Sequence, residues 1–422
     1  MKASMHFNLV TALAMAAASL APRAIAQHYT QVDLVANTSG IAPVTDPNLV
    51  NPWGLSRMSG SPWWISDNGT GLSTLYNGAG AINPLVVTIP KSDPNSKMFP
   101  AGTPTGTIAN GSATDFLLAP NTPALFLFST IDGTISGWNP AVGIPMGGSP
   151  PSKTATVMVR TKDGSSYTGL TSAWIEGKRY LYAANFTKGR VDVYDNAFHK
   201  VNLHEDNDRF FGGNNGGPGG GPGPGGPGQG GNRGGFDDQA FSDFFLPRNF
   251  VPFNVQAIGN DIVVTFVLHH EGQPFETDGP GLGFVDIFSS SGKLLRRLEP
   301  GPWLNAPWGV ALAPLDFGTY SHDLLIGQFA GGGMTEGSGT IAAYDLATGE
   351  FVGLVKDASG KPLAINGLWA LSPGNGASAG SSDPAGAPAA ELYFTAGPDH
   401  GTGGLFGYLK PVTTQLTQGN DQ

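Results

Sequence analysis

The side chains of this sequence that could hold a metal ion are concentrated in short glycine-rich segments. The densest cluster is His269-His270-Glu271, and a second pair, Asp399-His400, lies near the end of the chain. Imidazole and carboxylate groups together suit Zn²⁺ or another borderline divalent ion. An oxygen-rich subset, such as Glu271, Glu276 and Asp278 with Asn185, would suit Ca²⁺ instead. The candidate metal ligands are His269, His270, Glu271, Glu276, Asp278, Asp399 and His400.

Asparagine residues at the start of apolar segments form a second group of candidates. Three of these segments continue with an aromatic residue, Trp53, Trp308 or Trp369. An Asn side chain can ligate an ion or hydrogen-bond a sugar, and Trp offers an apolar platform beside it. The alternative, which we favour, is that Trp packs between neighbouring sheets while Asn makes the turn before the strand. With polar residues of the glycine-rich segments added, the candidate ligand-binding residues are Asn51, Asp67, Asn185, Asn305 and Asn366.

The composition excludes several kinds of chemistry. The chain has no cysteine, so it uses no disulfide, thiolate nucleophile or Cys-ligated metal. The formal net charge of −10 argues against nucleic acid as a partner, because nucleic-acid binding needs a basic surface to replace counterions. The metalloprotease motif HExxH is absent. Catalytic residues stay unassigned, and a glycosidase-type pair of carboxylates remains open.

An internal repeat in the sequence predicts the strands and turns that must position these residues. Its clearest copy consists of NAPWGVALAP (305–314), HDLLIGQF (322–329) and GTIAAYDL (339–346). Such short segments, rich in β-branched or aromatic residues and bounded by Gly, Pro, Asn or Asp, predict strands and turns. A fourth strand follows most copies, so the six copies predict an all-β fold: a six-bladed β-propeller with four-stranded antiparallel blades. The first strands are expected at residues 51–56, 113–120, 167–177, 251–260, 305–314 and 365–374.

The two ends of the repeat indicate how the ring closes. The sixth copy has no obvious fourth strand before the polar tail, whereas TQVDLVAN (30–37) is a spare strand at the other end. We expect this N-terminal strand to complete the last blade. In such a ring the loops between second and third strands share one face, so the candidate residues should gather there. A long array of β-sandwiches is the alternative all-β architecture.

The N-terminus has the features of an export signal. Lys2 precedes an apolar stretch (9–21), and Ala24-Ile25-Ala26 is a small-residue cleavage site. A membrane anchor is the weaker interpretation, because the stretch is short of the ~20 residues that a span needs. We therefore expect cleavage near Ala26 and a soluble protein, secreted or periplasmic, without a membrane span. The expected organisation is a signal peptide (1–26), a single propeller domain (27–411) with a disordered Gly/Pro-rich insertion (212–235), and a polar tail (412–422).

Six segments of the chain, taken in order, carry a resemblance to a known family. They are NPWGLS (51–56), GRVDVYDN (189–196), GLGFVDIF (281–288), NAPWGVALAP (305–314), INGLWAL (365–371) and LYFTAGP (392–398). The series is similar to the bacterial TIGR03118 family of uncharacterised exported proteins, which are thought to form NHL-like β-propellers. The resemblance spans about residues 29–410 and implies both the propeller fold and export. That family has no established activity to carry over.

These observations lead to two main hypotheses about function. The first is an exported soluble propeller, expected to be a monomer, that acts as a binding or interaction scaffold. Its partner would be an unknown small molecule, glycan or protein at the loop-rich face. The alternative is a metal-assisted hydrolase or lyase, in which Ca²⁺ or Zn²⁺ at the channel mouth polarises a carbonyl or activates water. Fold analogy alone supports the enzyme. A structural role in an extracellular matrix, suggested by the Gly/Pro-rich insertion, is a third and weaker hypothesis.

Overall fold

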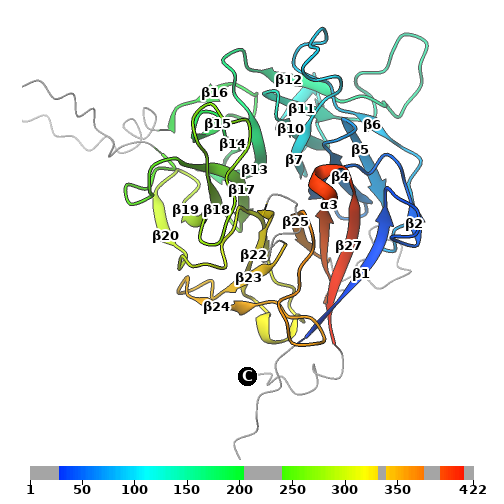
Figure 1. The fold of residues 1–422 in the computed structure, drawn as a ribbon. Coiled ribbons are helices and arrows are strands. Elements are labelled where there is room, and N and C mark those ends of the chain that lie inside the picture. The colour runs from blue at the N-terminus through cyan, green and yellow to red at the C-terminus, as the bar shows by residue number, and fades with distance from the viewer. Residues whose placement is uncertain (1–27, 204–239, 331–338, 375–389, 413–422) are drawn as a thin grey trace, which may run out of the picture.

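Six four-stranded antiparallel sheets stand around a common centre in the computed structural model (Figure 1). The structure describes residues 28–203, 240–330, 339–374 and 390–412. Each sheet is a blade whose first strand lies nearest the centre. The architecture is the six-bladed β-propeller that the repeat predicts.

The blades follow one another in chain order. Blade 1 consists of β3 (Pro52–Ser56), β4 (Trp63–Asp67), β5 (Leu72–Tyr76) and β6 (Val87–Thr88), and blade 2 of β7 (Pro104–Ala109), β10 (Phe126–Thr130), β11 (Thr134–Trp138) and β12 (Thr156–Arg160). Blade 3 consists of β13 (Tyr167–Ile175), β14 (Lys178–Asn185), β15 (Arg190–Tyr194) and β16 (Lys200–Val201), and blade 4 of β17 (Phe250–Ile258), β18 (Asp261–Leu268), β19 (Gly283–Phe288) and β20 (Leu294–Arg297). Blade 5 consists of β21 (Pro307–Leu312), β22 (Leu324–Gln328), β23 (Ile341–Tyr344) and β24 (Phe351–Leu354). Blade 6 consists of β25 (Leu368–Pro373), β26 (Leu392–Ala396), β27 (Leu405–Pro411) and β1 (Tyr29–Ala36), with β2 (Val44–Thr45) added at its edge.

The N-terminal strand closes the ring, as expected. Strand β1 pairs antiparallel with β27, from Tyr29 opposite Pro411 to Ala36 opposite Leu405. The last blade is thus built from both ends of the chain. Closure of this kind leaves few unpaired sheet edges, which would otherwise favour aggregation.

The expected first strand of the second copy, residues 113–120, was wrong. The innermost strand of blade 2 is β7, whereas β8 (Leu117–Ala119) pairs with β9 (Thr122–Pro123) in a separate small hairpin. An innermost strand must allow neighbouring blades to approach closely, and β7 does so at Gly106: a Cβ added there would lie 2.3 Å from the backbone nitrogen of Leu170 in blade 3.

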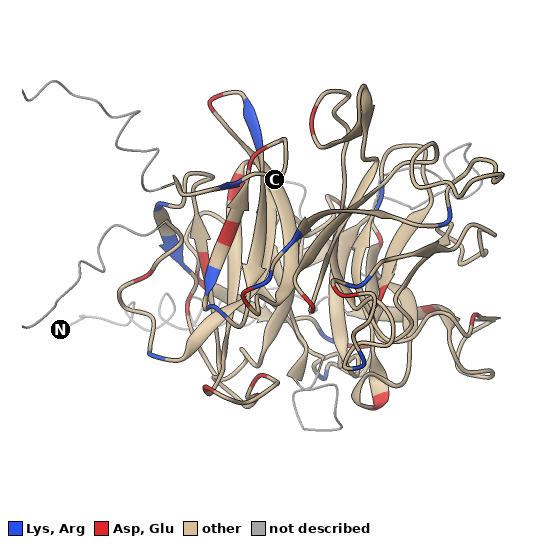
Figure 2. Ribbon diagram, turned by 90° about the horizontal axis from the view of Figure 1, so that it is seen from above, with Lys and Arg blue, Asp and Glu red and all other residues tan. Residues whose placement is uncertain are grey.

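The core consists of apolar clusters that fill the spaces between neighbouring blades. Between blades 1 and 2, for example, the ring of Trp64 stacks on Phe126 with centroids 4.2 Å apart, and Trp138 packs beside them. In the view of Figure 2 the strands are mostly free of charged residues, which lie mainly in the loops. Burial of these aromatic rings is the main stabilising contribution that the fold offers.

Several expectations concern residues outside the part of the chain that the structure describes. The signal peptide (1–26) and the Gly/Pro-rich insertion (212–235) fall there, as does all of the polar tail (412–422) except its first residue. Among the described residues, no helix is both long enough and apolar enough to cross a membrane.

Candidate functional site

The loops between second and third strands and the turns that precede the first strands meet on one face, which we call the loop-rich face. A backbone hydrogen bond joins the two in every blade. The bonds run from Asn68 N to Asn51 O, Ile131 N to Thr103 O, Phe186 N to Ser166 O, His269 N to Asn249 O, Phe329 N to Ala306 O and Gly397 N to Gly367 O. The backbone therefore fixes the loops to the innermost strands, and the polar residues of the loops share this face.

A cleft of about 580 Å³ opens on the loop-rich face between blades 3 and 4. One wall is the β14–β15 loop, with Thr187 and Lys188, and the other is the segment after β18, with His269, Glu271 and Gln273. This volume is in the range of small-molecule sites. The cleft contains two of the candidate metal ligands, His269 and Glu271.

His269 is held in place from two sides. Its ring lies 4.4 Å from the ring of Phe186, centroid to centroid, and Nε2 is 2.9 Å from the backbone oxygen of Gln273. The imidazole is thus half-buried and oriented, whereas the next two residues, His270 and Glu271, are exposed. An oriented imidazole beside exposed polar groups can bind a polar ligand or move a proton.

The other candidate metal ligands are not gathered into one site. Asp278, Asp399 and His400 are exposed, and Glu276 is half-buried, with burial raising its pKa and the Asp278 charge adding to the rise. Among the described residues, no group of three or more His, Asp or Glu side chains could hold a metal ion. A divalent cation therefore remains a prediction from the sequence, without a defined ligand set.

The asparagines at the strand starts mainly organise turns. Asn51 has a left-handed backbone with φ 47°, and its Oδ1 accepts a hydrogen bond from Trp369 Nε1 at 3.0 Å. Asn305 is buried, and its Oδ1 accepts from the backbone nitrogen of Gly279 at 2.6 Å. Asn366 is half-buried, and its Oδ1 has no hydrogen-bond partner among the described residues.

Asp67 and Asn185 stand at equivalent places, the last residues of the second strands of blades 1 and 3. Both are fully buried. Asn185 Nδ2 donates to Ser165 Oγ at 2.9 Å and to Asp192 Oδ2 at 2.7 Å. Asp67 Oδ2 accepts from the backbone nitrogen of Thr74 at 2.9 Å, but Oδ1 has no partner among the described residues. Both side chains are therefore parts of the blades and do not open into the cleft.

An aromatic plug fills the centre of the loop-rich face. It consists of Trp53, Phe186, Phe253, Trp308, Phe329 and Trp369, all buried. Trp369 stacks between Trp53 and Phe329, with ring centroids 3.6 and 3.8 Å away. The interpretation of these tryptophans as packing residues agrees with this arrangement, and the channel is closed to ligands at this end.

Sequence reasoning missed several residues that line the cleft. Lys188 and Gln273 line the cleft but were not among the candidates, because neither residue type is a usual metal ligand. Phe275, which follows the lining residue Pro274 in the β18–β19 loop, has an exposed side chain (72%). The signal that the sequence offered for this part of the cleft was a phenylalanine, Phe275, in an otherwise polar segment.

The fold defines the chain as a six-bladed β-propeller. No family model matches it. Two uncharacterized proteins of Acanthamoeba polyphaga mimivirus are 26% and 28% identical to it, over 89% of this chain and over 78% and 84% of theirs.

Among solved structures, the chain is similar to a streptogramin B lyase (TM-score 0.44, 9% identity, 92% of this chain and 98% of that one). It is also similar to the PQQ-bound aldose sugar dehydrogenase of Streptomyces coelicolor (TM-score 0.46, 12% identity, 93% and 100%). A protein of unknown function from Bacteroides thetaiotaomicron has a TM-score of 0.48 at 10% identity, over 92% and 76% of the two chains. At these scores the neighbours carry no argument about activity.

Proposed function

We propose that this chain is an exported β-propeller that binds a polar small molecule, with sugars as the best-fitting class, in the cleft between blades 3 and 4. The observation that carries the proposal is the 580 Å³ cleft, into which the ordered imidazole of His269 and the loop residues of two blades converge. Export is supported by the composition of residues 1–26 and by the resemblance to the TIGR03118 family.

The chemistry of the cleft favours an uncharged polar ligand. Lys188 and Glu271 contribute one charge of each sign, so the walls have little net charge. Thr187 and Gln273 add a hydroxyl and an amide group, which can both donate and accept hydrogen bonds. Beside them, the exposed ring of Phe275 offers an apolar surface on which the C–H face of a sugar ring can stack.

Titration of the purified protein with a panel of mono- and oligosaccharides, followed by calorimetry, tests the binding. Phe275→Ala should weaken binding about tenfold, because loss of an aromatic contact costs on the order of 1 kcal/mol. Its matched control is Phe245→Ala, since Phe245 is also exposed (81%) but lies outside the segments that line the cleft, whereas Phe275 directly follows the lining residue Pro274.

His269→Ala should weaken binding as well, whereas His199→Ala should not, because the exposed His199 lies in the turn between β15 and β16. Equal losses in the test and control variants, or no saccharide binding at all, would contradict the proposal. The export part is tested separately: the protein recovered outside the cytoplasm should begin at Gln27.

A further inference from the structure

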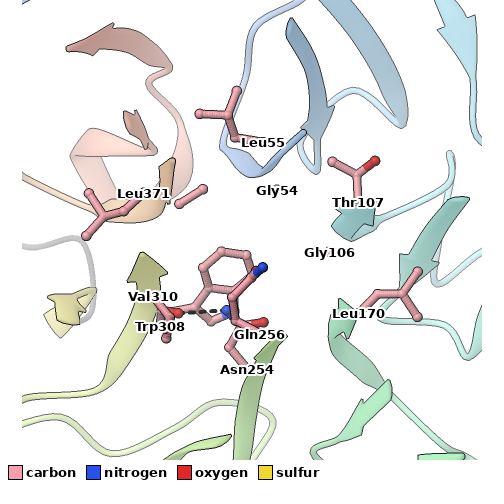
Figure 3. Close-up of a pocket in the computed structure, with 11 residues that line it drawn as sticks. Gly54, Leu55, Gly106, Thr107, Leu170, Asn254, Gln256, Trp308, Val310 and Leu371 are labelled. Carbon is pink, nitrogen blue, oxygen red and sulfur yellow. Dashed lines mark hydrogen bonds between the residues drawn. The ribbon is translucent and has the colours of Figure 1, made fainter. Parts of the chain in front are cut away.

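The central channel is closed at the loop-rich face by the aromatic plug, and a cavity of about 380 Å³ opens at the opposite end. We call this cavity the lower mouth. A narrow space of about 20 Å³ lies between the two and shares Leu55, Thr107 and Gln256 with the lower mouth (Figure 3). The volume of the lower mouth is in the range of small-molecule sites.

The ends of the innermost strands line the lower mouth. Each of these strands is the edge of its sheet, so the backbone N–H and C=O groups on that edge face the channel and not another strand of the blade. The described lining residues come from five of the six blades and are Leu55, Ser56, Arg57, Thr107, Ile108, Ala109, Thr171, Ser172, Gln256, Ala257, Ser372 and Pro373. The cavity is therefore built by the closed ring, and its lining is rich in hydrogen-bonding groups.

The described lining of the lower mouth offers a ligand no free charge. It contains no acidic residue, and its one basic residue, Arg57, is engaged within the protein. The Arg57 guanidinium carbon lies 5.0 Å from the centroid of the Trp63 ring, and Nη2 donates to the backbone oxygen of Pro373 at 3.5 Å. A charged ligand would lose its hydration here without gaining a free partner of opposite charge, so the lining favours an uncharged ligand.

Ser172 presents a hydroxyl group whose direction is fixed. Arg179 Nε and Nη2 both donate to Ser172 Oγ, at 3.2 and 2.9 Å. Because these two bonds occupy the lone pairs of Oγ, the hydroxyl proton is left to donate to a ligand oxygen. The adjacent Thr171 accepts at Oγ1 a hydrogen bond from the backbone nitrogen of Ala257 at 2.9 Å, which ties blade 3 to blade 4. This wall of the lower mouth is thus ordered before a ligand arrives.

The remaining polar side chains can both donate and accept hydrogen bonds. Gln256 Nε2 has a long contact of 3.5 Å with the backbone oxygen of Ala257, so the amide can reorient toward a ligand. Ser56 and Ser372 add half-buried hydroxyl groups from blades 1 and 6. Apolar residues such as Leu55 belong to the same lining. A carbon ring that carries several hydroxyl groups matches both kinds of surface.

We propose that the lower mouth is a binding site for a small uncharged cyclic polyol, whose hydroxyl groups bond to Ser172, Gln256 and Ser372 while its C–H groups lie against the apolar lining. The site lies at the other end of the channel from the cleft between blades 3 and 4 and is independent of it. A ligand of about twelve non-hydrogen atoms, such as myo-inositol, should bind with a dissociation constant of about 5 mM.

A single introduced thiol tests occupancy of the lower mouth directly. Because the chain has no cysteine, Ser372→Cys places its only thiol in the lining. The rate of reaction of this thiol with a small uncharged maleimide should fall about tenfold in about 50 mM myo-inositol, because the bound polyol covers it. The matched control is Ser149→Cys, at an exposed position outside the lining, whose reaction rate should not change.

Two relatives of the probe test the chemistry of recognition on the same carbon ring. Cyclohexanol, with one hydroxyl group, should protect the thiol at least about tenfold less well, because it leaves most polar groups of the lining without a partner. Inositol 1-phosphate should protect no better than myo-inositol, because no free cation awaits the phosphate. Equal protection by cyclohexanol, or clearly better protection by the phosphate, would overturn the assignment of an uncharged polyol.

Gln256→Leu, combined with the thiol, should weaken protection about tenfold, because the amide's hydrogen bonds are lost at nearly constant volume. Gln31→Leu, at a half-buried position on the outer strand β1, should leave it unchanged. Ser172→Ala serves if Gln256→Leu does not fold, and should also weaken protection. Phe275→Ala should have no effect, which separates this site from the cleft. No protection in about 100 mM myo-inositol, or full protection in both the Gln256 and Ser172 variants, would overturn the proposal.

Discussion

Three blades bury a carboxylate in their second or third strand, and the surroundings of these carboxylates differ. Asp192 in blade 3 is bonded by Arg190, Lys200 and Asn185, and although burial opposes it, these bonds hold its pKa below the usual value. Asp286 in blade 4 is paired with Arg297, yet burial raises its pKa to about 6. Each of these carboxylates has a cation beside it, which offsets the cost of burying a charge.

Asp67 in blade 1 has no such cation among the described residues. Burial raises its pKa well above the usual range, against the lowering effect of hydrogen bonds from Thr74, and the charge of Asp46 adds to the rise. Because the folded-state pKa lies above the unfolded value, Asp67 supports the fold below its unfolded pKa. That support is lost as the pH rises through the folded pKa. The buried carboxyl group of Asp67 therefore lowers the free energy of unfolding at neutral pH.

Asp67→Asn should make the protein more stable at pH 7 by about 1–3 kcal/mol, because it removes the cost of burying an ionisable carboxyl group that has no cation beside it. Asn already occupies the equivalent position in blade 3, at Asn185. The gain should disappear at about pH 3.5, below the ordinary Asp pKa of about 3.9. Urea unfolding at both pH values measures it, with the exposed Asp261→Asn as control. A variant no more stable than the parent at pH 7 would show that Asp67 is stabilised as a carboxylate.

At the scale of the elements, the innermost strands share two features that set the width of the channel. Each has a register shift against the second strand of its blade, between Pro52 and Leu55 in blade 1 and between Pro252 and Asn254 in blade 4, for example. Beside this bulge, four blades have a glycine: Gly54, Gly106, Gly169 and Gly309. A Cβ on any of them would lie within 2.6 Å of the next blade.

Blade 4 replaces the glycine with Asn254, whose Nδ2 donates to the backbone oxygen of Trp308 in blade 5 at 2.7 Å (Figure 3). The side chain thus takes the place of close backbone contact at this one junction. The same junction faces the narrow part of the channel. Glycine at the four junctions named above is explained by close approach of the neighbouring blade.

Gly106→Ala should destabilise the propeller by about 2 kcal/mol or more, because the added methyl group overlaps the backbone of Leu170 and the strands must separate. The matched control is Gly111→Ala, since a Cβ at Gly111 would meet no atom within 4 Å. Chemical unfolding of both variants measures the difference. Equal stabilities would mean that the blades move apart without cost, and that the narrow channel is not a constraint on the sequence.

At the scale of the whole molecule, stability depends on closure of the ring by β1. Its buried residues include Tyr29, Val35 and Ala36, and the hydroxyl of Tyr29 donates to the backbone oxygen of Phe317 in the β21–β22 connection at 2.6 Å. The strand therefore joins blade 6 to its neighbours on both sides, since Val35 packs with Trp63 of blade 1.

Removal of residues 27–37 should lower the melting temperature sharply, by on the order of 10 °C or more, because β27 loses its partner and the ring opens. Removal of residues 413–422 is a control that leaves every described strand intact. Calorimetric melting of the two truncated proteins measures the effect. An unchanged melting profile after loss of the N-terminal strand would show that the blades hold together without closure.

Part of the candidate site was accessible from the sequence. The repeat places His269 and Glu271 in a loop of the face where loops gather, and both line the cleft. Asp67 and Asn185 belong to the same kind of loop, but their side chains turn into the blades. Residues one position apart on a strand point to opposite faces, so a small error in the end of a strand changes whether a side chain is buried or available.

The sequence by itself determined the number of blades, the strand that closes the ring and the face on which the loops meet. Those features follow from local information: short apolar segments, turn residues and their period along the chain. Only the tertiary structure decided that β7 is the innermost strand of blade 2, that aromatic rings close one end of the channel, and that Arg57, Ser172 and Gln256 line the other end. These features depend on distances between blades, which are fixed only when the ring closes and the innermost strands pack around the axis.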